Sequence, residues 1–300
     1  MGDGLSGGRQ GRGLIVVTGA LGFVASRLLP RLLEGGGPVV ALVRPGRDAS
    51  RLAALGIEVR RADLDDPAIG AEAFAGACAV VHLAGLALVP RFLGALERAG
   101  VPRGVFVSSA GVHTRLVSAG ADAKRAGEAR LRAASLEATI LRPSMIYGRP
   151  GDRNLERLLR WLARVPVVPL PGGGRVLQQP VHVDDLECAI VASLERPAAR
   201  RSEYDVGGPE ALSLRALIEQ SAQALGRRAV LIPLPLRPVH GLVRALRRMG
   251  LPVPIRPEQL LRLEESKAVD LTPARRDLDF APRSFAEGIG AEAAMLAGRR

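Results

Sequence analysis

The segment VVTGALGFVASRLL, residues 16–29, decides the fold, because an apolar strand runs through a glycine turn straight into an amphipathic helix. Glycine at position 19 permits a sharp turn, and glycine at position 22 lets backbone N–H groups approach a pyrophosphate. The helix N-terminus adds partial positive charge, and Ala25 is small enough for close packing of helix on strand. The segment therefore predicts a dinucleotide-binding turn.

Short apolar runs alternate with segments of helical period through the first half of the chain. The expected strands are 14–18, 38–43, 57–62, 78–84, 104–109 and 138–143, and the expected helices are 22–34, 67–75, 87–99 and 122–135. This alternation is typical of an α/β fold of the Rossmann type, a doubly wound parallel sheet with helices on both faces.

The pattern changes after Gly148, and the run PVVPLPGGG at 166–174 predicts a loop. We expect a flexible tail, a nucleotide-binding core and a smaller C-terminal α+β cap. The tail is 1–13, the core is 14–148 with returning segments near 178–210, and the cap is 149–177 and 211–300.

The composition, with 47% hydrophobic and 24% charged residues, describes a soluble globular protein with a sizeable core. Cys78 and Cys188 lie in apolar stretches, which favours two buried, reduced thiols in a cytoplasmic protein. The glycine-rich start has no apolar h-region, so we expect a tail rather than a signal peptide. No run approaches the roughly 20 apolar residues of a transmembrane helix.

The net charge of +12 is spread from Arg9 to Arg300 without a dense tract, and aromatic residues make up only 3%. This pattern does not favour a specific nucleic-acid site, since stacking side chains are scarce. The segment 237–255 has apolar residues at helical spacing opposite several arginines. It fits either a cap helix with a solvated basic face or peripheral contact with an anionic membrane. The sequence is compatible with a homodimer as well as with a monomer.

The end of the second expected strand bears on the choice of cofactor. It reads LVRPGR, and no carboxylate follows until Asp48. NAD sites usually place an acidic residue here for the ribose 2′-hydroxyl, whereas Arg44 and Arg47 could clamp a 2′-phosphate. The sequence favours NADP(H) over NAD(H), although Arg44 could also be an ordinary surface arginine.

Seven motifs follow one another in register: TGALGF (18–23), RRADLDDP (60–67), VVHLAG (80–85), FVSSAG (106–111), LRPSMIYG (141–148), QPVHVDDL (179–186) and YDVGGPEALSL (204–214). Together they resemble the short-chain dehydrogenase/reductase superfamily, most of all its NAD(P)-dependent epimerase/dehydratase members and a divergent, atypical branch. The resemblance covers nearly the whole chain. One atypical branch that is similar across QPVHVDDL serves as a non-catalytic accessory subunit of respiratory complex I.

The resemblance implies where the cofactor binds. Asp63 would accept from the adenine amino group with Leu64 beside the ring, and Pro143 would run past the nicotinamide. The full expected cofactor-binding set is Gly19, Ala20, Leu21, Gly22, Phe23, Val24, Arg44, Arg47, Asp63, Leu64, Leu83, Ala84, Gly85, Ser108, Lys124, Pro143 and Met145.

The resemblance also implies a serine that binds the substrate oxygen, and a tyrosine four residues before a lysine. A free phenol titrates near pH ~10, so the lysine is needed to lower its pKa. Ser109 matches the serine and Lys124 the lysine, but Gly120 stands in place of the tyrosine. Tyr147 and His113 are the alternative proton donors.

Two departures from the family pattern bear on the substrate. Gln178 stands where enzymes acting on nucleotide-sugars usually have an arginine, and Met145 where an asparagine is common. We therefore expect a small, mostly apolar, non-nucleotide substrate, although Arg175 could compensate. His182, Asp184 and Asp185 do not form a convincing set of metal ligands, so no metal is expected.

Two hypotheses follow. The first is an oxidoreductase or epimerase-like enzyme that transfers hydride at an oxygen-bearing carbon. The second is an NAD(P)H-binding protein without turnover, acting as a redox sensor or as an accessory or assembly subunit.

Overall fold

The computed structural model describes residues 13–148, 151–152, 154–235, 238, 249 and 265–298. The chain forms two compact units. The first contains Met1–Val107, Ala123–Ile140 and Ser193–Ser202, and the second contains Ser108–Asp122, Leu141–Ala192 and Glu203–Arg300. The domain boundaries expected from the sequence stay predictions. The tail 1–12 and nearly all of 237–255 lie outside the described residues.

The sheet is parallel and has seven strands in the order β11-β6-β5-β4-β1-β2-β3. The strands are β1 (Ile15–Thr18), β2 (Val39–Val43), β3 (Glu58–Arg61), β4 (Ala79–His82), β5 (Arg103–Val107), β6 (Glu137–Pro143) and β11 (Glu203–Val206). Every residue of β1, β2 and β4 is buried, as expected of strands covered on both faces. The predicted doubly wound parallel sheet is confirmed.

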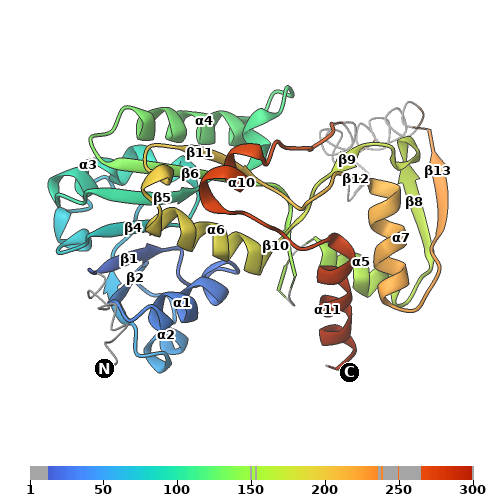
Figure 1. The fold of residues 1–300 in the computed structure, drawn as a ribbon, viewed down its shortest axis with the longest axis horizontal. Coiled ribbons are helices and arrows are strands. Elements are labelled where there is room, and N and C mark those ends of the chain that lie inside the picture. Colours follow the sequence, from blue (N-terminus) through green and yellow to red (C-terminus); the bar gives the residue numbers. More distant parts are fainter. Residues whose placement is uncertain are drawn as a thin grey trace, which may run out of the picture. The chain divides into compact units, whose positions relative to one another are not determined.

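Helices cover both faces of the strands in the first unit. Figure 1 shows α1 (Ala25–Glu34) and α2 (Ser50–Ala54) on one face, and α3 (Val89–Arg98) and α4 (Ala119–Arg132) on the other. The 3₁₀ turn η1 (Ala71–Phe74) lies between β3 and β4, and η2 (Leu86–Leu88) lies between β4 and α3. The predicted helix 67–75 is wrong beyond η1, because the extended backbone of Gly70, with φ −92 and ψ 169, interrupts it.

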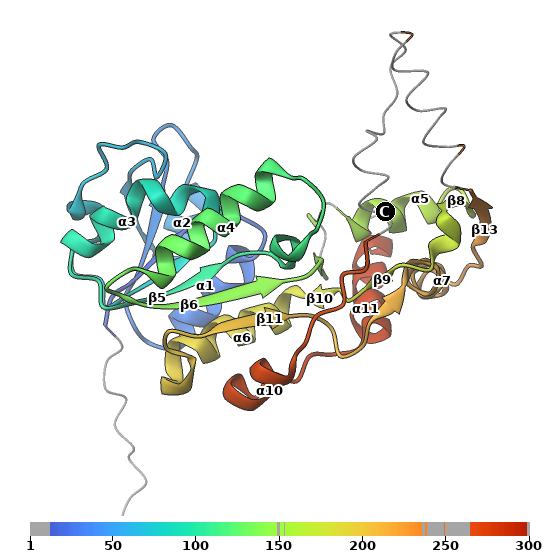
Figure 2. The same cartoon turned by 90° about the horizontal axis from the view of Figure 1, so that it is seen from above.

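The second unit is built from short paired strands and helices. The pairs are β7 (Ile146–Tyr147) with β10 (Val181–His182), β9 (Leu177–Gln178) with β12 (Leu212–Ser213), and β8 (Val167–Pro171) with β13 (Val230–Leu234). The helices are α5 (Leu155–Leu162), α6 (Val183–Glu195), α7 (Leu214–Ala224), α10 (Thr272–Leu278) and α11 (Phe285–Ala297), with 3₁₀ turns η3 (Ala110–His113), η4 (Gly172–Gly174) and η5 (Pro197–Ala199). Helix α7 contacts both α5 and α11, as Figure 2 shows.

The loop predicted at 166–174 is a strand over most of its length. Val168 and Leu170 are buried against α5 and α7, while Val167 and Pro169 point outward. A two-stranded ribbon has a free edge on each strand, so a proline that lacks an N–H is tolerated there. The loop prediction was wrong because β8 is stabilised by pairing with β13, which lies some sixty residues further along the chain.

Neither cysteine forms a disulfide, and neither is buried. Cys78 is half-buried and Cys188 is exposed. The prediction of two buried thiols is wrong for a geometric reason, since Cys188 occupies the solvent-facing side of α6 while its neighbours Leu186 and Ala189 face the core. Among the described helices, none combines the length and the apolar character needed to cross a bilayer.

Candidate functional site

The turn between β1 and α1 depends on Gly19. Its φ of +68 lies in the left-handed region that favours glycine. A Cβ at this position would lie 2.8 Å from the carbonyl carbon of Leu83 and 2.9 Å from the amide nitrogen of Ala84. Only glycine therefore lets the turn approach the backbone that follows β4. The amide of Gly22 donates to the Gly19 carbonyl at 2.9 Å and closes the turn.

The N-terminus of α1 is open to an anion. Val24 is the N-cap residue, no side chain caps the helix, and its first turn carries no acidic residue. Ala20 is buried, Phe23 and Val24 are half-buried, and Leu21 is exposed. The free N–H groups of a helix N-terminus favour phosphate, so this corner fits the pyrophosphate of a dinucleotide.

A buried histidine ties the two sides of this corner together. His82, at the end of β4, has its Nδ1 2.7 Å from the Thr18 hydroxyl and its Nε2 3.0 Å from the carbonyl oxygen of Gly85. Because Nε2 must donate to that carbonyl, Nδ1 accepts from Thr18. Burial lowers the pKa of His82 to about 4, so the ring is neutral.

The motif VVHLAG did not by itself predict this clamp. The signal was a polar residue at the end of an otherwise apolar strand. The clamp fixes the segment Leu83–Gly85, which was expected to pass the cofactor, and Gly85 itself has φ +103. Sequence positions 19, 22 and 83–85 are therefore brought together at one corner of the first unit.

Arg44 and Arg47 are exposed on one loop after β2. The guanidinium of Arg61 holds this loop from β3, donating to the carbonyl of Arg47 at 2.7 Å and to that of Arg44 at 3.4 Å. Asp48, the first carboxylate after β2 in the sequence, accepts from the amide of Ser50 at 2.9 Å. This hydrogen bond to the backbone lowers the pKa of Asp48 and engages it at the start of α2.

The predicted adenine residues differ in their exposure. Asp63 is half-buried, and its Oδ1 accepts from the amide of Asp65 at 3.0 Å. Leu64 is buried in the main core of the first unit. Because Leu64 packs in this core, it supports the segment after β3 from the inside of the unit.

Ser109 is the N-cap of the 3₁₀ turn η3 in the second unit, and His113 is the last residue of that turn. The Ser109 hydroxyl accepts from the amide of Gly111 at 3.1 Å, and the amide of Ser108 donates to Leu141 at 2.7 Å. His113 Nε2 lies 2.9 Å and 3.1 Å from the two carboxylate oxygens of Asp205 on β11. The structure thus adds Asp205, which lies in the motif YDVGGPEALSL but had been given no role, as the partner of His113.

Lys124 lies on α4 and is half-buried. Gly120 lies four residues earlier, one helical turn away on the same face. A Cβ added at Gly120 would meet nothing within 4 Å, so the place of the expected tyrosine is open. Ser109 and His113 belong to the second unit and Lys124 to the first.

Tyr147 is a core residue of the second unit. It is 1% exposed and packs with Phe285, whose ring centroid lies 5.2 Å away. A Cβ added at Gly288 of α11 would lie 2.2 Å from the Tyr147 hydroxyl, so the phenol fills the space beside that helix. Burial raises the pKa of Tyr147 far above its ordinary value. Met145 packs partly buried against the same cluster, and Pro143 is buried at the end of β6.

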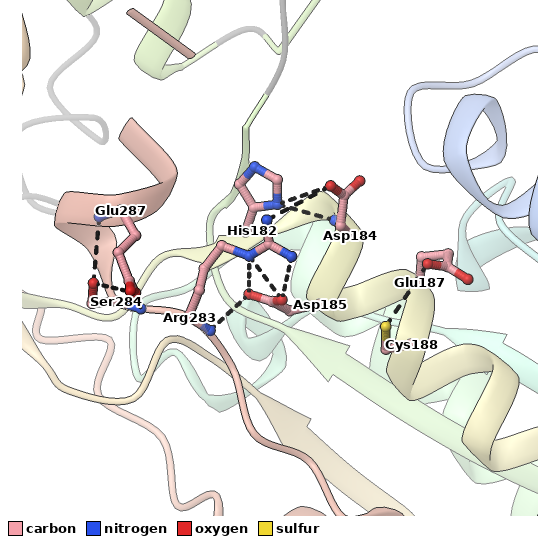
Figure 3. Close-up of polar contacts among 8 residues, drawn as sticks. All are labelled: His182, Asp184, Asp185, Glu187, Cys188, Arg283, Ser284 and Glu287. Atoms are coloured by element: carbon pink, nitrogen blue, oxygen red, sulfur yellow. Dashed lines mark hydrogen bonds and ion pairs between the residues drawn. The ribbon is translucent and has the colours of Figure 1, made fainter. Parts of the chain in front are cut away.

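The motif QPVHVDDL anchors the C-terminal segment, as Figure 3 shows. Asp185 accepts from the Arg283 amide at 3.1 Å and from its Nε at 3.0 Å, while Asp184 lies 3.7 Å from the same guanidinium. His182 Nδ1 accepts from the amide of Asp184 at 3.2 Å, so the imidazole itself caps α6. Burial, and then the charge of Arg283, lower the pKa of His182.

Two buried carboxyl groups lie near this anchor. Glu292 of α11 is fully buried and accepts from the amide of Gly148 at 3.1 Å. Asp152 is buried too, and its Oδ1 accepts from the amides that begin α5, that of Leu155 at 2.8 Å among them. Burial first, and the Asp152 charge second, raise the pKa of Glu292 to about 8. Glu292 therefore keeps its proton at neutral pH.

Comparison with known proteins gives a consistent pattern. Residues 19–159 match a family model described as NAD(P)H-binding. The chain is 31% identical over 238 residues to a ceramide reductase of Caulobacter vibrioides, covering 75% of this chain and 74% of that protein. It is 28% identical over 313 residues to the mitochondrial NADH dehydrogenase (ubiquinone) 1 alpha subcomplex subunit 9 of Arabidopsis thaliana, covering 93% of this chain and 77% of that one.

Among solved structures, UDP-glucose 4-epimerase from Thermotoga maritima, with UDP-glucose, has a TM-score of 0.74 to this chain. The match covers 95% of this chain and 99% of that one at 18% sequence identity. At that identity the likeness shows the fold alone.

Proposed function

The chain belongs to the short-chain dehydrogenase/reductase superfamily, among its NAD(P)-binding, epimerase/dehydratase-like members, and from that premise we propose that it is an NADP(H)-dependent oxidoreductase. In this proposal a hydride moves between the nicotinamide and an oxygen-bearing carbon of an apolar, non-nucleotide substrate. The observation that carries the proposal is the Gly19 corner, where a left-handed glycine, a close backbone and an uncapped helix N-terminus meet.

The preference for NADP(H) rests on the loop after β2. Arg44 and Arg47 are exposed there, and Arg61 holds the loop backbone. Asp48, the first carboxylate after β2, accepts from the Ser50 amide at the start of α2. Two guanidinium groups suit a 2′-phosphate, which carries charge and several acceptor oxygens.

The acid–base chemistry is assigned to Ser109 and His113. Ser109 hydrogen-bonds the substrate oxygen, and Lys124 binds the nicotinamide ribose. His113 exchanges the proton through Nδ1, because its Nε2 is held by the Asp205 carboxylate. Such a carboxylate fixes the orientation of the ring. The deep burial and raised pKa of Tyr147 argue against that residue as the donor.

The substrate is expected to be lipid-like. Gln178 replaces the arginine that would bind a nucleotide diphosphate, and it is buried. The Caulobacter relative is named for ceramide, an apolar molecule without a nucleotide. A long-chain ketone or secondary alcohol fits both observations.

The first test is binding followed by turnover. NADPH and NADH are titrated by fluorescence, and bound NADPH is then offered a panel of ketones, aldehydes and quinones that includes long-chain 3-oxo compounds. We expect tighter binding of NADPH than of NADH and oxidation by an apolar ketone. Binding without oxidation across the panel would remove the enzymatic proposal.

Matched variants separate the roles. Lys124→Met is expected to weaken NADPH binding about tenfold, which corresponds to about 1.4 kcal/mol. Arg130→Met, which changes an exposed residue of the same helix, is the control and should bind NADPH as wild type does.

His113→Gln and Asp205→Asn should lower kcat by ~100-fold or more, within the usual range for general acid–base catalysis, and leave NADPH binding unchanged. Wild-type kcat in both variants would discard the dyad.

A second candidate is a cofactor-binding accessory subunit without turnover. It is favoured by Gly120 in place of the tyrosine, and the Arabidopsis relative is named as an NADH dehydrogenase subunit. Gly120→Tyr distinguishes the two, because nothing lies within 4 Å of the added Cβ. An enzyme that uses His113 should gain little from the new phenol, whereas a latent site should acquire turnover that wild type lacks.

A further inference from the structure

The ribbon of β8 and β13 buries one face and exposes the other. Their parallel register pairs Val167 with Val230 and Pro169 with Ile232. Side chains alternate across a strand, so these four residues share one face. The opposite face, with Val168 and Leu170, packs on the core formed with α5 and α7. The outward face is therefore apolar without being part of the core.

This face continues onto the end of α5. Val230 is 56% exposed, Ile232 46% and Trp161 50%. The Trp161 indole N–H donates to the carbonyl of Val167 at 3.1 Å, which places the ring beside the ribbon. Val165, in the connecting turn, is also exposed. We call Trp161, Val165, Val167, Pro169, Val230 and Ile232 the ribbon face. A contiguous apolar surface of this kind marks an interaction site.

Arginines gather at one end of the ribbon face. Both strands begin at the same end, so Arg164, three residues before Val167, and Arg227, three before Val230, are brought to that end. Arg160, Arg164 and Arg227 line one hollow of about 350 Å³ with Leu159, Ala163, Leu225, Leu296 and Ala297. Arg228 is exposed beside it. Arg160 is paired with Glu156 at 2.6 Å, so the basic charge at this end comes from Arg164, Arg227 and Arg228.

Apolar side chains bordered by arginines fit the interface of an anionic bilayer. The apolar residues enter the boundary between headgroups and acyl chains, and the arginines meet lipid phosphates. Each basic residue near such a surface contributes ~1 kcal/mol. An indole with one polar edge suits that boundary.

We propose that the ribbon face is a peripheral binding surface for anionic phospholipid membranes. This inference stands apart from the proposed enzymatic function, since it concerns residues that are not assigned to the nucleotide site or to catalysis.

The chain offers its own reporter, because Trp161 is its single tryptophan. The full-length protein is mixed with vesicles of phosphatidylcholine alone, or with 30% phosphatidylglycerol, a proportion chosen on the order of natural anionic membranes. We expect co-sedimentation and a blue shift of tryptophan emission with the anionic vesicles only. Both signals should decline as salt rises, since the attraction is screened.

Matched substitutions test the assignment. Val230→Glu is expected to weaken vesicle binding at least tenfold, and Arg164→Glu with Arg227→Glu to a similar extent. Val117→Glu is the control, because Val117 is fully exposed elsewhere and the chemical change is identical. Circular dichroism and thermal melts check that each variant folds. Wild-type vesicle binding by Val230→Glu, or loss of binding by Val117→Glu, would overturn the proposal.

Two other outcomes would also overturn it. A concentration-dependent dimer that Val230→Glu disrupts, without any vesicle binding by wild type, would assign the surface to a second copy. A tryptophan emission that is already blue-shifted without lipid, and unchanged by vesicles, would mean that another part of the chain covers it.

Discussion

The two units bury polar side chains in different ways. His82 of the first unit has both ring nitrogens hydrogen-bonded and is neutral. In the second unit His182, Asp152 and Glu292 each keep one buried side-chain atom without a hydrogen-bond partner among the described residues. The first unit therefore holds its site with backbone and neutral hydrogen bonds, which change little with pH. The second unit contains buried ionisable groups, and the free-energy cost of burying each of them depends on whether it is protonated.

The largest effect is expected at the corner itself, where the first unit depends on one glycine. Gly19→Ala should weaken NADPH binding at least ~100-fold, about 2.7 kcal/mol, because the added Cβ would push against the Leu83 and Ala84 backbone. Gly36→Ala is a matched control, since Gly36 has φ +76 but nothing within 4 Å of an added Cβ. Both variants bear the strain of a left-handed alanine, and only the first should lose binding by fluorescence titration.

If Gly36→Ala lost affinity as strongly as Gly19→Ala, backbone strain alone would explain the result. The close approach of the two loops would then have no special part in binding.

The next effect concerns the second unit and its pH dependence. The pKa of Glu292 is raised from 4.5 to about 8. Between these values the unfolded chain loses a proton that the folded chain retains, so the free energy of unfolding should fall as pH rises. The slope should reach at most about 1.4 kcal/mol per pH unit and should flatten above pH 8. The negative charges of Asp152 and Glu156 also raise the pKa of the Glu292 carboxyl.

Glu292→Gln should remove this slope in urea unfolding measured from pH 5 to 9, since glutamine does not titrate. Glu287→Gln is the opposite case on the same helix. Hydrogen bonds from Ser284 lower the pKa of Glu287, so its contribution is present above its ordinary pKa and is lost as pH falls. A slope that survives in Glu292→Gln would refute the assignment.

The sequence predicts those features that depend on residues close together along the chain. The Gly19 corner was predictable because a glycine pattern reports backbone geometry over a few residues. The clamp between Thr18 and His82 was not, because it joins residues 64 positions apart and needs the register of β1 and β4. The β8 strand was missed for the same reason: its prolines indicate a loop until β13 is placed beside it. Asp205 and Glu292 likewise gained a role only from distant partners.

The smallest effect tests whether the neutral clamp serves the cofactor or only the fold. Thr18→Val leaves the buried Nδ1 of His82 without its donor, which should cost ~1–3 kcal/mol of stability. It should also weaken NADPH binding by a factor of roughly three to ten, up to about 1.4 kcal/mol, because the Leu83–Gly85 segment loses its tether. Thr139→Val is the control in the same unit. Its buried hydroxyl donates to Ala199 at 2.6 Å, so that variant should lose similar stability and keep wild-type affinity. Equal affinity in the two variants would reduce the clamp to a packing feature of the sheet.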